Sequence, residues 1–396
     1  MNKNSSKKIL MVLYSYYPQD PRPRREIDAL IQAGHQVDLI CLREIGQAKK
    51  EKKFGCNVYR INLQRSRISK IKYIQLYLSF FIRSFFVLNW MYIKNRYDVI
   101  HAHNMPDFLV FPAVIPKILG SKIILDLHDP SPEILMTSFN KGKDSRLLKV
   151  IKWIEKASIK FSDIVITVNK AFVDTFISRG CPKEKLRIIM NSPQTSVFEK
   201  YAKNAVIKPR GDKFVLMYHG LIVERHGLDT MVEALKVLRH KIPNLEMIIC
   251  GYGEYKPQLL EDIKESNLED IVNFMGEVTI DKIAETIPQI DVGIIPNKIT
   301  PFTQINFPTR IFEYLINKKP AIVPRTIGIK DYFAEDEIFY FNGGDEQDLI
   351  NVIMEIYQNP EKSKEIIEKS YKIYKEHTWE IQSNSLLQIY DELTRK

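Results

Sequence analysis

Short apolar runs alternate with amphipathic stretches along most of the chain. Each run has the length and apolar character of a buried strand, and most runs are followed by a helical pattern. The runs of the first half are 8–14, 36–41, 58–62, 98–101, 122–126 and 163–167, and those of the second half are 214–218, 246–250, 271–274, 292–295 and 321–323. Strands that alternate with helices at this spacing predict β-α-β units and parallel sheets covered on both faces. The predicted fold class is therefore α/β.

The alternation breaks once, near the middle of the chain. After Asn191-Ser-Pro193 the sequence turns polar, and residues 208–212 are typical of a linker end. We therefore expect an N-terminal domain over residues 1–195, a C-terminal domain over 213–360, and helices over 361–396 that pack back on the N-terminal domain. Ligands of parallel α/β sheets bind beyond the carboxyl ends of the strands. The loops after the strands, and a cleft between two facing sheets, are the expected sites.

The composition is that of a globular protein, with 45% hydrophobic and 27% charged residues among 396. The 58 basic and 48 acidic residues leave a charge of +10, but the basic residues are spread along the chain, so we expect no nucleic-acid partner. The four cysteines lie far apart without a C-x-x-C pair, which excludes an ordinary cysteine zinc site and a dense disulfide framework. The first apolar run is too short for a signal peptide, so the expected compartment is the cytoplasm.

Residues 65–96 combine basic flanks with aliphatic and aromatic bulk. Arg83 divides the apolar part into two pieces of about ten residues, whereas a membrane span needs about twenty. Aromatic side chains beside Lys and Arg suit the lipid headgroup region, so we expect an interfacial helix at an anionic membrane surface. The alternative is a buried helix that flanks the sheet.

Two segments of the second half carry candidate chemistry. After the run 214–218, Gly220 allows close backbone approach, and Arg225 with His226 stands where a helix opens. Donor groups, a cation and a helix N-terminus together favour an anion, best a diphosphate.

In the second segment, Pro308 can occupy the first turn of a helix, which puts Thr309 and Arg310 at its N-terminus. Glu313 follows one turn later, and its carboxylate can accept hydrogen bonds from the two neighbouring hydroxyls of a ribose. The alternative is a solvated helix glutamate.

Five motifs of the second half occur in order and resemble those of the retaining nucleotide-sugar glycosyltransferases of family four. The motifs are Arg225-His-Gly-Leu-Asp229, Ile249-Cys-Gly-Tyr-Gly-Glu254, Phe274-Met-Gly276, Asp291-Val-Gly-Ile-Ile-Pro296 and Pro308-Thr-Arg-Ile-Phe-Glu-Tyr314. In the first half, residues 15–22, 24–26, 101–104 and 126–133 are similar to the acceptor-side loops of that family. The resemblance covers essentially the whole chain and implies the GT-B architecture, in which two Rossmann-like domains face a central cleft.

The resemblance also implies roles for individual residues. Glu313 resembles the glutamate that holds the donor ribose, and Arg225 resembles the cation that neutralises the diphosphate. His128 is similar to the histidine that reaches the donor sugar, so His128 and Arg225 are the expected catalytic residues. The residues expected to bind the nucleotide sugar are Gly220, Arg225, His226, Gly251, Asn306, Thr309, Arg310 and Glu313, and those expected on the acceptor side are Asp20, Arg22 and His103.

One position departs from the family pattern. The family places a first glutamate eight positions before Glu313, and this chain has Ile305 there, with Gln304 and Asn306 as neighbouring polar candidates. The identity of the sugar is therefore left open.

Two further expectations concern metal and cofactor. A D-x-D pair is absent from the loops after the strands, which agrees with a metal-independent reaction and no cofactor. For His101 and His103 a polar active-site loop is a better interpretation than a metal site.

The leading hypothesis is a cytosolic, membrane-associated glycosyltransferase. It would move a hexosyl or N-acetylhexosaminyl group from a nucleotide sugar, expected to be a UDP-sugar, to a glycan or lipid-linked acceptor in cell-surface polysaccharide synthesis. One alternative keeps the fold and is a sugar-nucleotide epimerase. The other is a catalytically degenerate sugar-nucleotide binder.

Overall fold

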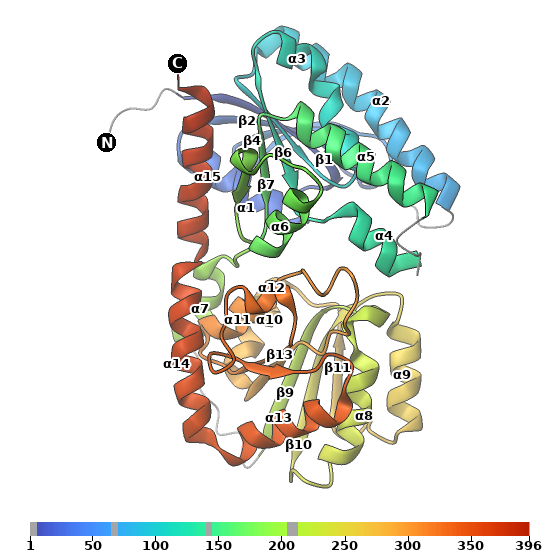
Figure 1. The fold of residues 1–396 in the computed structure, drawn as a ribbon, viewed down its shortest axis with the longest axis vertical. Helices are drawn as coiled ribbons and strands as arrows, with labels where there is room; N and C mark the ends of the chain where they lie inside the picture. Colours follow the sequence, from blue (N-terminus) through green and yellow to red (C-terminus); the bar gives the residue numbers. More distant parts are fainter. Residues whose placement is uncertain (1–5, 65–69, 140–144, 204–212, 396) are drawn as a thin grey trace. The chain divides into compact units, whose positions relative to one another are not determined.

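The computed structural model describes residues 6–64, 70–139, 145–203 and 213–395, and the chain forms two compact units (Figure 1). The N-terminal unit comprises Met1–Asn191 and Gln382–Lys396, and the C-terminal unit comprises Ser192–Ile381. The change of unit after Asn191 falls close to the expected end of the first domain. The C-terminal helices differ from the expectation, because residues 361–381 belong to the C-terminal unit and only the stretch from Gln382 onward belongs to the N-terminal unit.

The N-terminal unit contains an eight-stranded sheet in the order β3-β4-β2-β1-β5-β6-β7-β8. All neighbouring pairs are parallel except β3–β4. The strands are β1 (Lys8–Tyr16), β2 (Gln36–Leu42), β3 (Lys50–Lys53), β4 (Cys56–Ile61), β5 (Val99–His103), β6 (Lys122–Leu127), β7 (Ile164–Thr167) and β8 (Leu186–Ile188). The apolar runs predict six of them. They do not predict β3 and β8, because β3 reads Lys-Glu-Lys-Lys and β8 has only three residues.

Helices of the N-terminal unit cover this sheet. They are α1 (Pro21–Gln32), α2 (Lys70–Asn95), the 3-10 helix η1 (Asp107–Ala113), α3 (Val114–Ile118), α4 (Ser131–Phe139), α5 (Arg146–Phe161), α6 (Lys170–Ser178) and the 3-10 helix η2 (Lys183–Lys185). The last helix, α15 (Trp379–Thr394), adds Leu386, Ile389 and Tyr390 to the core formed by α1 and the central strands. Because the strands are buried on both faces, they read as nearly continuous apolar runs.

Helix α2 is continuous through Arg83, the residue that divides its apolar sequence into two uncharged pieces. Its Ile74–Asn95 segment is long and apolar enough to cross a bilayer, with a mean hydropathy of 1.4, and a third of that segment is buried. The buried apolar residues of the helix are Phe80, Leu88, Met91 and Tyr92, and Ser84 and Asn89 are buried beside them. Six other large apolar side chains, at intervals of three or four residues, are 49–71% exposed: Ile74, Leu78, Ile82, Phe86, Trp90 and Ile93. The helix therefore flanks the sheet on one side and presents an apolar face on another. The predicted basic flank at residues 65–69 lies outside the described residues.

The C-terminal unit contains a six-stranded, fully parallel sheet in the order β11-β10-β9-β12-β13-β14. The strands are β9 (Phe214–Leu221), β10 (Leu245–Tyr252), β11 (Val272–Gly276), β12 (Val292–Ile294), β13 (Ala321–Pro324) and β14 (Phe339–Phe341). The helices are α7 (Thr195–Lys203), η3 (Glu224–His226), α8 (Leu228–Leu238), α9 (Lys256–Glu265), α10 (Ile280–Thr286), η4 (Ile287–Gln289), α11 (Arg310–Ile316), α12 (Ile327–Lys330), α13 (Glu346–Gln358) and α14 (Pro360–Glu376). The apolar runs predict five of these strands and do not predict the three-residue β14.

Candidate active site

The ends of β9 and β10 approach each other closely in the C-terminal unit. A Cβ built on Gly220, whose φ is +135°, would lie 2.5 Å from Nη1 of Arg310. A Cβ built on Gly251 would lie 2.0 Å from the carbonyl oxygen of Gly220. Neither position has room for a side chain, so packing at the carboxyl end of the sheet already requires both glycines. Their contact with a donor remains a prediction.

Arg310 is the first residue of α11, and its guanidinium is buried against the end of β9. Nη1 donates to the carbonyl oxygen of His219 at 2.6 Å, and Nη2 lies 3.4 Å from Oδ1 of Asn297. The guanidinium carbon is 4.7 Å from the ring centroid of Tyr218. These contacts join the loop after β12 to the end of β9 and fix one positive charge at the carboxyl end of the sheet.

The α11 segment places Glu313 beside a buried histidine. The helix begins at Arg310 with Thr309 at the N-cap, so Pro308 precedes the helix instead of occupying its first turn. Oε2 of Glu313 lies 3.2 Å from Nε2 of His219, and the two side chains are 12% and 5% exposed. Burial, together with the charge of Arg310, lowers the pKa of His219 to about 3. The imidazole is therefore neutral at pH 7, and its buried Nε2 faces the carboxylate.

Arg225 and His226 form the 3-10 turn η3 that precedes α8, as the sequence predicts. Nδ1 of His226 lies 2.6 Å from the carbonyl oxygen of Leu221 and 3.1 Å from the hydroxyl of Tyr218. Burial, with the charges of Arg310 and Arg225, lowers the pKa of His226 to about 3. His226 therefore binds the turn through Nδ1 and carries no charge at pH 7, which leaves Arg225 as the cation of η3.

A third cation at this edge is Lys298, which the sequence motifs do not single out. Its ammonium pairs with the carboxylate of Asp229, and its backbone N–H donates to the carbonyl oxygen of Arg225 at 3.0 Å. Lys298 lies four residues after the end of β12, and that position after a strand is the signal that could have identified it.

The backbone of the loop between β12 and α11 packs against Gly328 of α12. The N–H of Gly328 donates to the carbonyl oxygen of Gln304 at 3.1 Å, and a Cβ on Gly328 would lie 2.4 Å from the carbonyl oxygen of Ile305. Gln304, Ile305 and Asn306 are all half-buried. The position of the missing family glutamate thus lies on an ordered loop, and Asn306 remains a predicted sugar contact.

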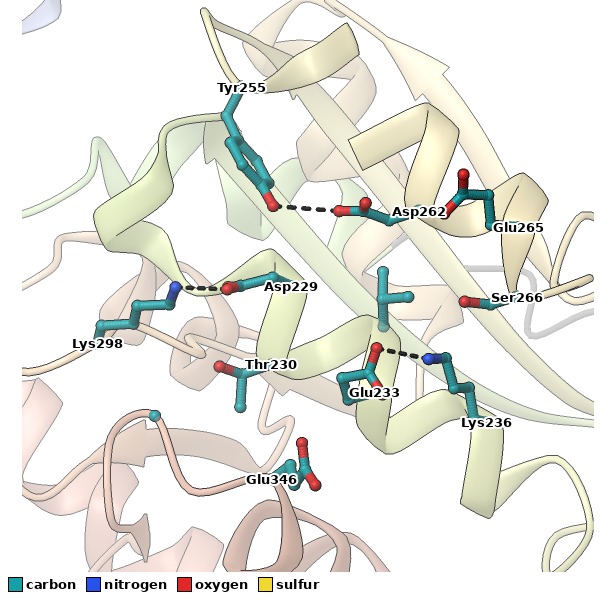
Figure 2. Close-up of a pocket in the computed structure, with 12 residues that line it drawn as sticks. Asp229, Thr230, Glu233, Lys236, Tyr255, Asp262, Glu265, Ser266, Lys298 and Glu346 are labelled. Atoms are coloured by element: carbon teal, nitrogen blue, oxygen red, sulfur yellow. Dashed lines mark hydrogen bonds and ion pairs between the residues drawn. The ribbon is translucent and has the colours of Figure 1, made fainter. Parts of the chain in front are cut away.

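A pocket of about 830 Å³ adjoins this edge between α8, α9 and the loop at Gly344, and Lys298 and Asp229 both line it (Figure 2). Carboxylates dominate its lining, which includes Asp229, Glu233, Asp262, Glu265 and Glu346. An acidic lining disfavours a diphosphate, and none of the residues predicted to bind the donor lines this pocket.

In the N-terminal unit, Arg22 and Asp126 form a buried ion pair. Nη2 of Arg22 lies 2.9 and 2.8 Å from the two carboxylate oxygens, and Nε lies 3.0 Å from Oδ2. Nη1 donates to Oδ1 of Asn191 at 2.6 Å. Asp20 caps α1, since its carboxylate accepts from the backbone N–H of Arg22 at 3.3 Å. Arg22 is only 6% exposed.

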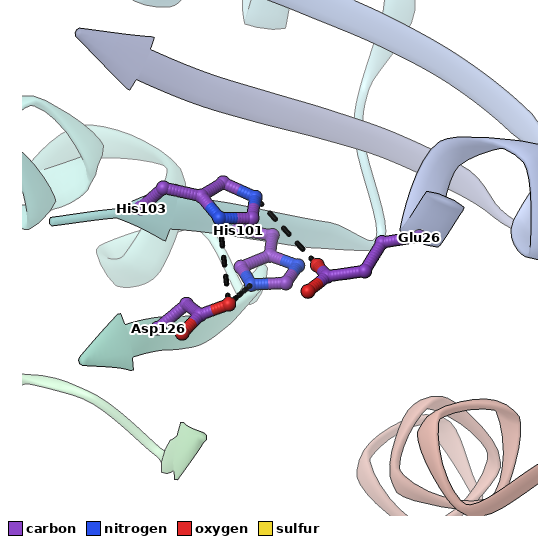
Figure 3. A group of neighbouring side chains, drawn as sticks. All are labelled: Glu26, His101, His103 and Asp126. Carbon is purple, nitrogen blue, oxygen red and sulfur yellow. Dashed lines mark ion pairs between the residues drawn. The ribbon is translucent and has the colours of Figure 1, made fainter. Parts of the chain in front are cut away.

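Strand β5 contains both His101 and His103, so it extends two residues beyond the predicted run 98–101, into the segment interpreted as an active-site loop. Both are fully buried, and with Glu26 and Asp126 they form a group whose potential ligand atoms lie within 4.8 Å of one another (Figure 3). The chemistry of this group does not fit a metal, because the guanidinium of Arg22 already binds both oxygens of Asp126 and lies 3.3 Å from Glu26. A divalent cation would have to enter beside a buried positive charge.

His128 follows β6 directly, and its Nδ1 lies 3.5 Å from Oδ1 of Asp126. Its side chain is 19% exposed, whereas the imidazoles of His101 and His103 have no exposed surface. The predicted residues therefore form two groups. Gly220, Arg225, His226, Gly251, Thr309, Arg310 and Glu313 surround the carboxyl end of the second sheet, and Arg22, His103 and His128 meet at Asp126.

Two family models match successive parts of this chain. Residues 24–195 match the model described as Glycosyltransferase Family 4, and residues 200–373 match the model described as Glycosyl transferases group 1. Among curated proteins, the amylovoran biosynthesis glycosyltransferase AmsK of Erwinia amylovora is 21% identical over 50% of this chain and 48% of its own. The sulfoquinovosyl transferase SQD2 of Arabidopsis thaliana is 22% identical over 69% of this chain and 52% of its own. The matches thus span about half the length of these two relatives.

Two solved structures are similar over almost the whole chain. Sucrose-phosphate synthase from Thermosynechococcus elongatus has a TM-score of 0.79 at 18% identity, over 98% of this chain and 99% of its own. HepE of Anabaena, in complex with UDP-glucose, has a TM-score of 0.72 at 17% identity, over 98% of this chain and 100% of its own. At these identities the likeness establishes the shared fold.

Proposed function

This chain belongs to the group 1 glycosyltransferases of family four and has their GT-B fold of two Rossmann-like units, and from that premise we propose that it is a retaining, metal-independent glycosyltransferase. The donor is a nucleotide-diphosphate sugar, and the acceptor is a glycan or a lipid-linked glycan precursor in cell-surface polysaccharide synthesis. A UDP-sugar is the first donor to test, since HepE has been solved with UDP-glucose.

One observation carries the donor half of the proposal. The cations Arg225, Lys298 and Arg310 and the carboxylate of Glu313 gather at the carboxyl ends of β9 and β12. This edge is where parallel α/β sheets bind their ligands. In the proposed complex, Arg225 meets the diphosphate and Glu313 accepts hydrogen bonds from the ribose hydroxyls. His128 of the N-terminal unit acts at the donor sugar.

The proposed reaction breaks the bond between the anomeric carbon and the distal phosphate oxygen. The acceptor oxygen bonds to the anomeric carbon on the face of the leaving group, and its proton passes to the departing phosphate. The products are the glycoside, with its anomeric configuration retained, and a nucleoside diphosphate. Negative charge grows on the phosphate as the bond breaks, and Arg225 with backbone N–H groups of the loop after β9 would stabilise that charge without a metal.

The function is tested by incubating the protein with UDP-, GDP- and ADP-sugars, with and without lipid-linked acceptors, and measuring nucleoside diphosphate release. Release that requires an acceptor supports transfer, and NMR of the product reports the anomeric configuration. A changed sugar without any acceptor would support the epimerase alternative, which the transferase names of the relatives do not favour. Binding without turnover across the panel would support a degenerate binder. Undiminished activity in EDTA is expected for a metal-independent reaction.

The acceptor half of the proposal rests on the exposed apolar face of α2. The helix contains no acidic residue, and η1 packs against both α2 and α5, since Phe108 contacts Tyr77 and Phe81 while Phe111 contacts Phe161. Helix α5 adds the exposed apolar side chains Leu147, Val150 and Trp153 and the exposed cations Arg146, Lys149, Lys156 and Lys160. Apolar bulk beside unopposed cations suits an anionic lipid surface, where each cation contributes about 1 kcal/mol. In this proposal the protein is cytoplasmic and peripheral at the inner face of the membrane, where lipid-linked acceptors reside.

A further inference from the structure

Buried carboxylates and imidazoles alternate in a chain behind His128. Nε2 of His103 lies 3.8 Å from Oε2 of Glu26, and Nδ1 of the same ring lies 3.4 Å from Oδ2 of Asp126. The second oxygen of Asp126 lies 3.5 Å from Nδ1 of His128. The order is therefore Glu26, His103, Asp126 and His128, and only the last side chain keeps appreciable exposure, 19% against 0–1%.

This burial changes the role that we assign to two of the predicted residues. The resemblance assigns Arg22 and His103 to the acceptor side, but their side chains are 7% and 0% exposed. Their polar atoms face Asp126, so an acceptor sugar has no direct access to His103 and little to Arg22. The ion pair with Arg22 instead holds the Asp126 carboxylate by a fork of hydrogen bonds, which fixes its orientation.

We propose that Asp126 is a positioning residue for His128. Its Oδ1 accepts a hydrogen bond from Nδ1–H of His128, which fixes the ring and leaves Nε2 as the nitrogen that meets the substrate. Arg22 holds Asp126 through its hydrogen bonds, and His103 and Glu26 lie behind Asp126 in the buried chain. The separation of 3.5 Å is long for a hydrogen bond in the absence of substrate, and such contacts commonly shorten in the substrate complex. The inference rests on the proposed function, in which His128 acts at the donor sugar.

The charges around His128 agree with this arrangement. Burial alone would lower the pKa of His128, but the hydrogen bond and charge of Asp126 outweigh it and raise that pKa. Burial alone would raise the pKa of Asp126, but Arg22 and the two neighbouring histidines hold it well below its usual range. Burial raises the pKa of Glu26 and, with His103, lowers that of His101. The titratable or charged groups that face His128 are Arg22, Glu26, His101, His103, Asp107, Asp126 and Asp129.

The first test measures the tautomer of His128 in the wild-type protein and does not require enzymatic activity. Long-range ¹H–¹⁵N NMR of the ¹⁵N-labelled full chain reports which nitrogen of each neutral imidazole carries the proton, and a His128→Gln variant identifies the His128 signal among the eight histidines. The expected result is the Nδ1–H tautomer for neutral His128. An Nε2–H tautomer would overturn the proposal, because Nδ1 would then have no proton to donate to Asp126.

The second test uses Asp126→Asn, with Asp129→Asn as the matched control. Removing the Asp126 charge should lower the pKa of His128 by about one pH unit, because an opposite charge at this distance favours the protonated ring. The NMR titration midpoint then moves to lower pH, and the smaller effect expected for Asp129→Asn measures general electrostatics alone. Equal shifts in the two variants would overturn the proposal. If Asp126→Asn does not fold, the wild-type tautomer decides.

The third test is kinetic and requires a wild-type protein that transfers sugar. Misplacement of the ring at the reacting centre in Asp126→Asn should lower kcat about 100-fold, with the donor KM nearly unchanged. The pH limb of activity that belongs to His128 should move to lower pH with the NMR midpoint. Unchanged kcat in the folded variant would also contradict the positioning role. An inactive wild-type protein with the Nδ1–H tautomer would refute the proposed function and leave the geometry of the pair supported.

Discussion

Replacing Glu313 by alanine should weaken donor binding by a predictable amount. The carboxylate is 12% exposed and lies 3.2 Å from Nε2 of a neutral, buried His219. A hydrogen bond to a charged group contributes about 1.5 to 3 kcal/mol. Since 1.4 kcal/mol corresponds to a factor of ten, the Kd should rise about 10- to 150-fold. Glu313→Gln, which keeps one acceptor oxygen without the charge, should fall between the wild type and alanine.

Isothermal titration calorimetry with UDP and UDP-glucose measures this effect, with GDP and ADP as further probes if UDP does not bind. The matched control is Glu368→Ala, which removes an exposed carboxylate paired with Lys318 at 2.6 Å and should leave the Kd unchanged. Thermal unfolding of each variant separates lost binding from lost folding, because alanine also leaves the buried Nε2 of His219 without its carboxylate. A folded Glu313→Ala protein that binds the nucleotide with wild-type affinity would remove Glu313 from the site and refute the reasoning.

Three other outcomes are expected. Arg225→Ala should lower kcat more than it raises the donor KM, because the phosphate charge grows in the transition state; steady-state kinetics that show only a higher KM would indicate uniform binding. Gly293→Ala should lower the Tm in thermal unfolding, since a Cβ there would lie 2.3 Å from an aromatic ring of α11 and overpacking costs about 1–3 kcal/mol; an unchanged Tm would mean that α11 moves aside freely. The protein should sediment with anionic vesicles at low salt and be released at high salt, and Phe86→Ser with Trp90→Ser should weaken sedimentation, whereas Ile280→Ser, an exposed apolar position of the C-terminal unit, should not. Wild-type protein that stays in solution with such vesicles would contradict the membrane proposal.

Hydrophobic patterning predicts the parallel sheets well because strands buried on both faces must be apolar along their length. The runs at 8–14 and 214–218 become β1 and β9, the central strands of the two sheets. The three strands that the pattern does not predict, β3, β8 and β14, each lie at the edge of a sheet. Strand β3 is held by antiparallel pairing with β4, not by burial, so its charged sequence gives no signal.

The candidate site is predictable in its residue types and less so in their roles. Position after a strand identifies Arg225 and His226 together, yet only the structure separates them, because Nδ1 of His226 is used by the carbonyl oxygen of Leu221. A histidine in such a loop has the same sequence signal whether it meets a ligand or holds the loop. The distinction depends on burial and on partners several residues away, which the pattern of apolar positions does not contain.

The histidines of β5 show where sequence reasoning reaches its limit. Residues two apart on a strand share a face, so a strand extended to His103 would already have placed both imidazoles together. The partners of these histidines give no such sequence signal. Arg22 and Asp126 are 104 positions apart in the sequence, and only the sheet order, with β5 between β1 and β6, brings them together. An acidic or basic residue near the carboxyl end of a sheet can therefore contact substrate directly or act through a neighbour. Burial decides between the two, and for Asp126 it favours action through His128.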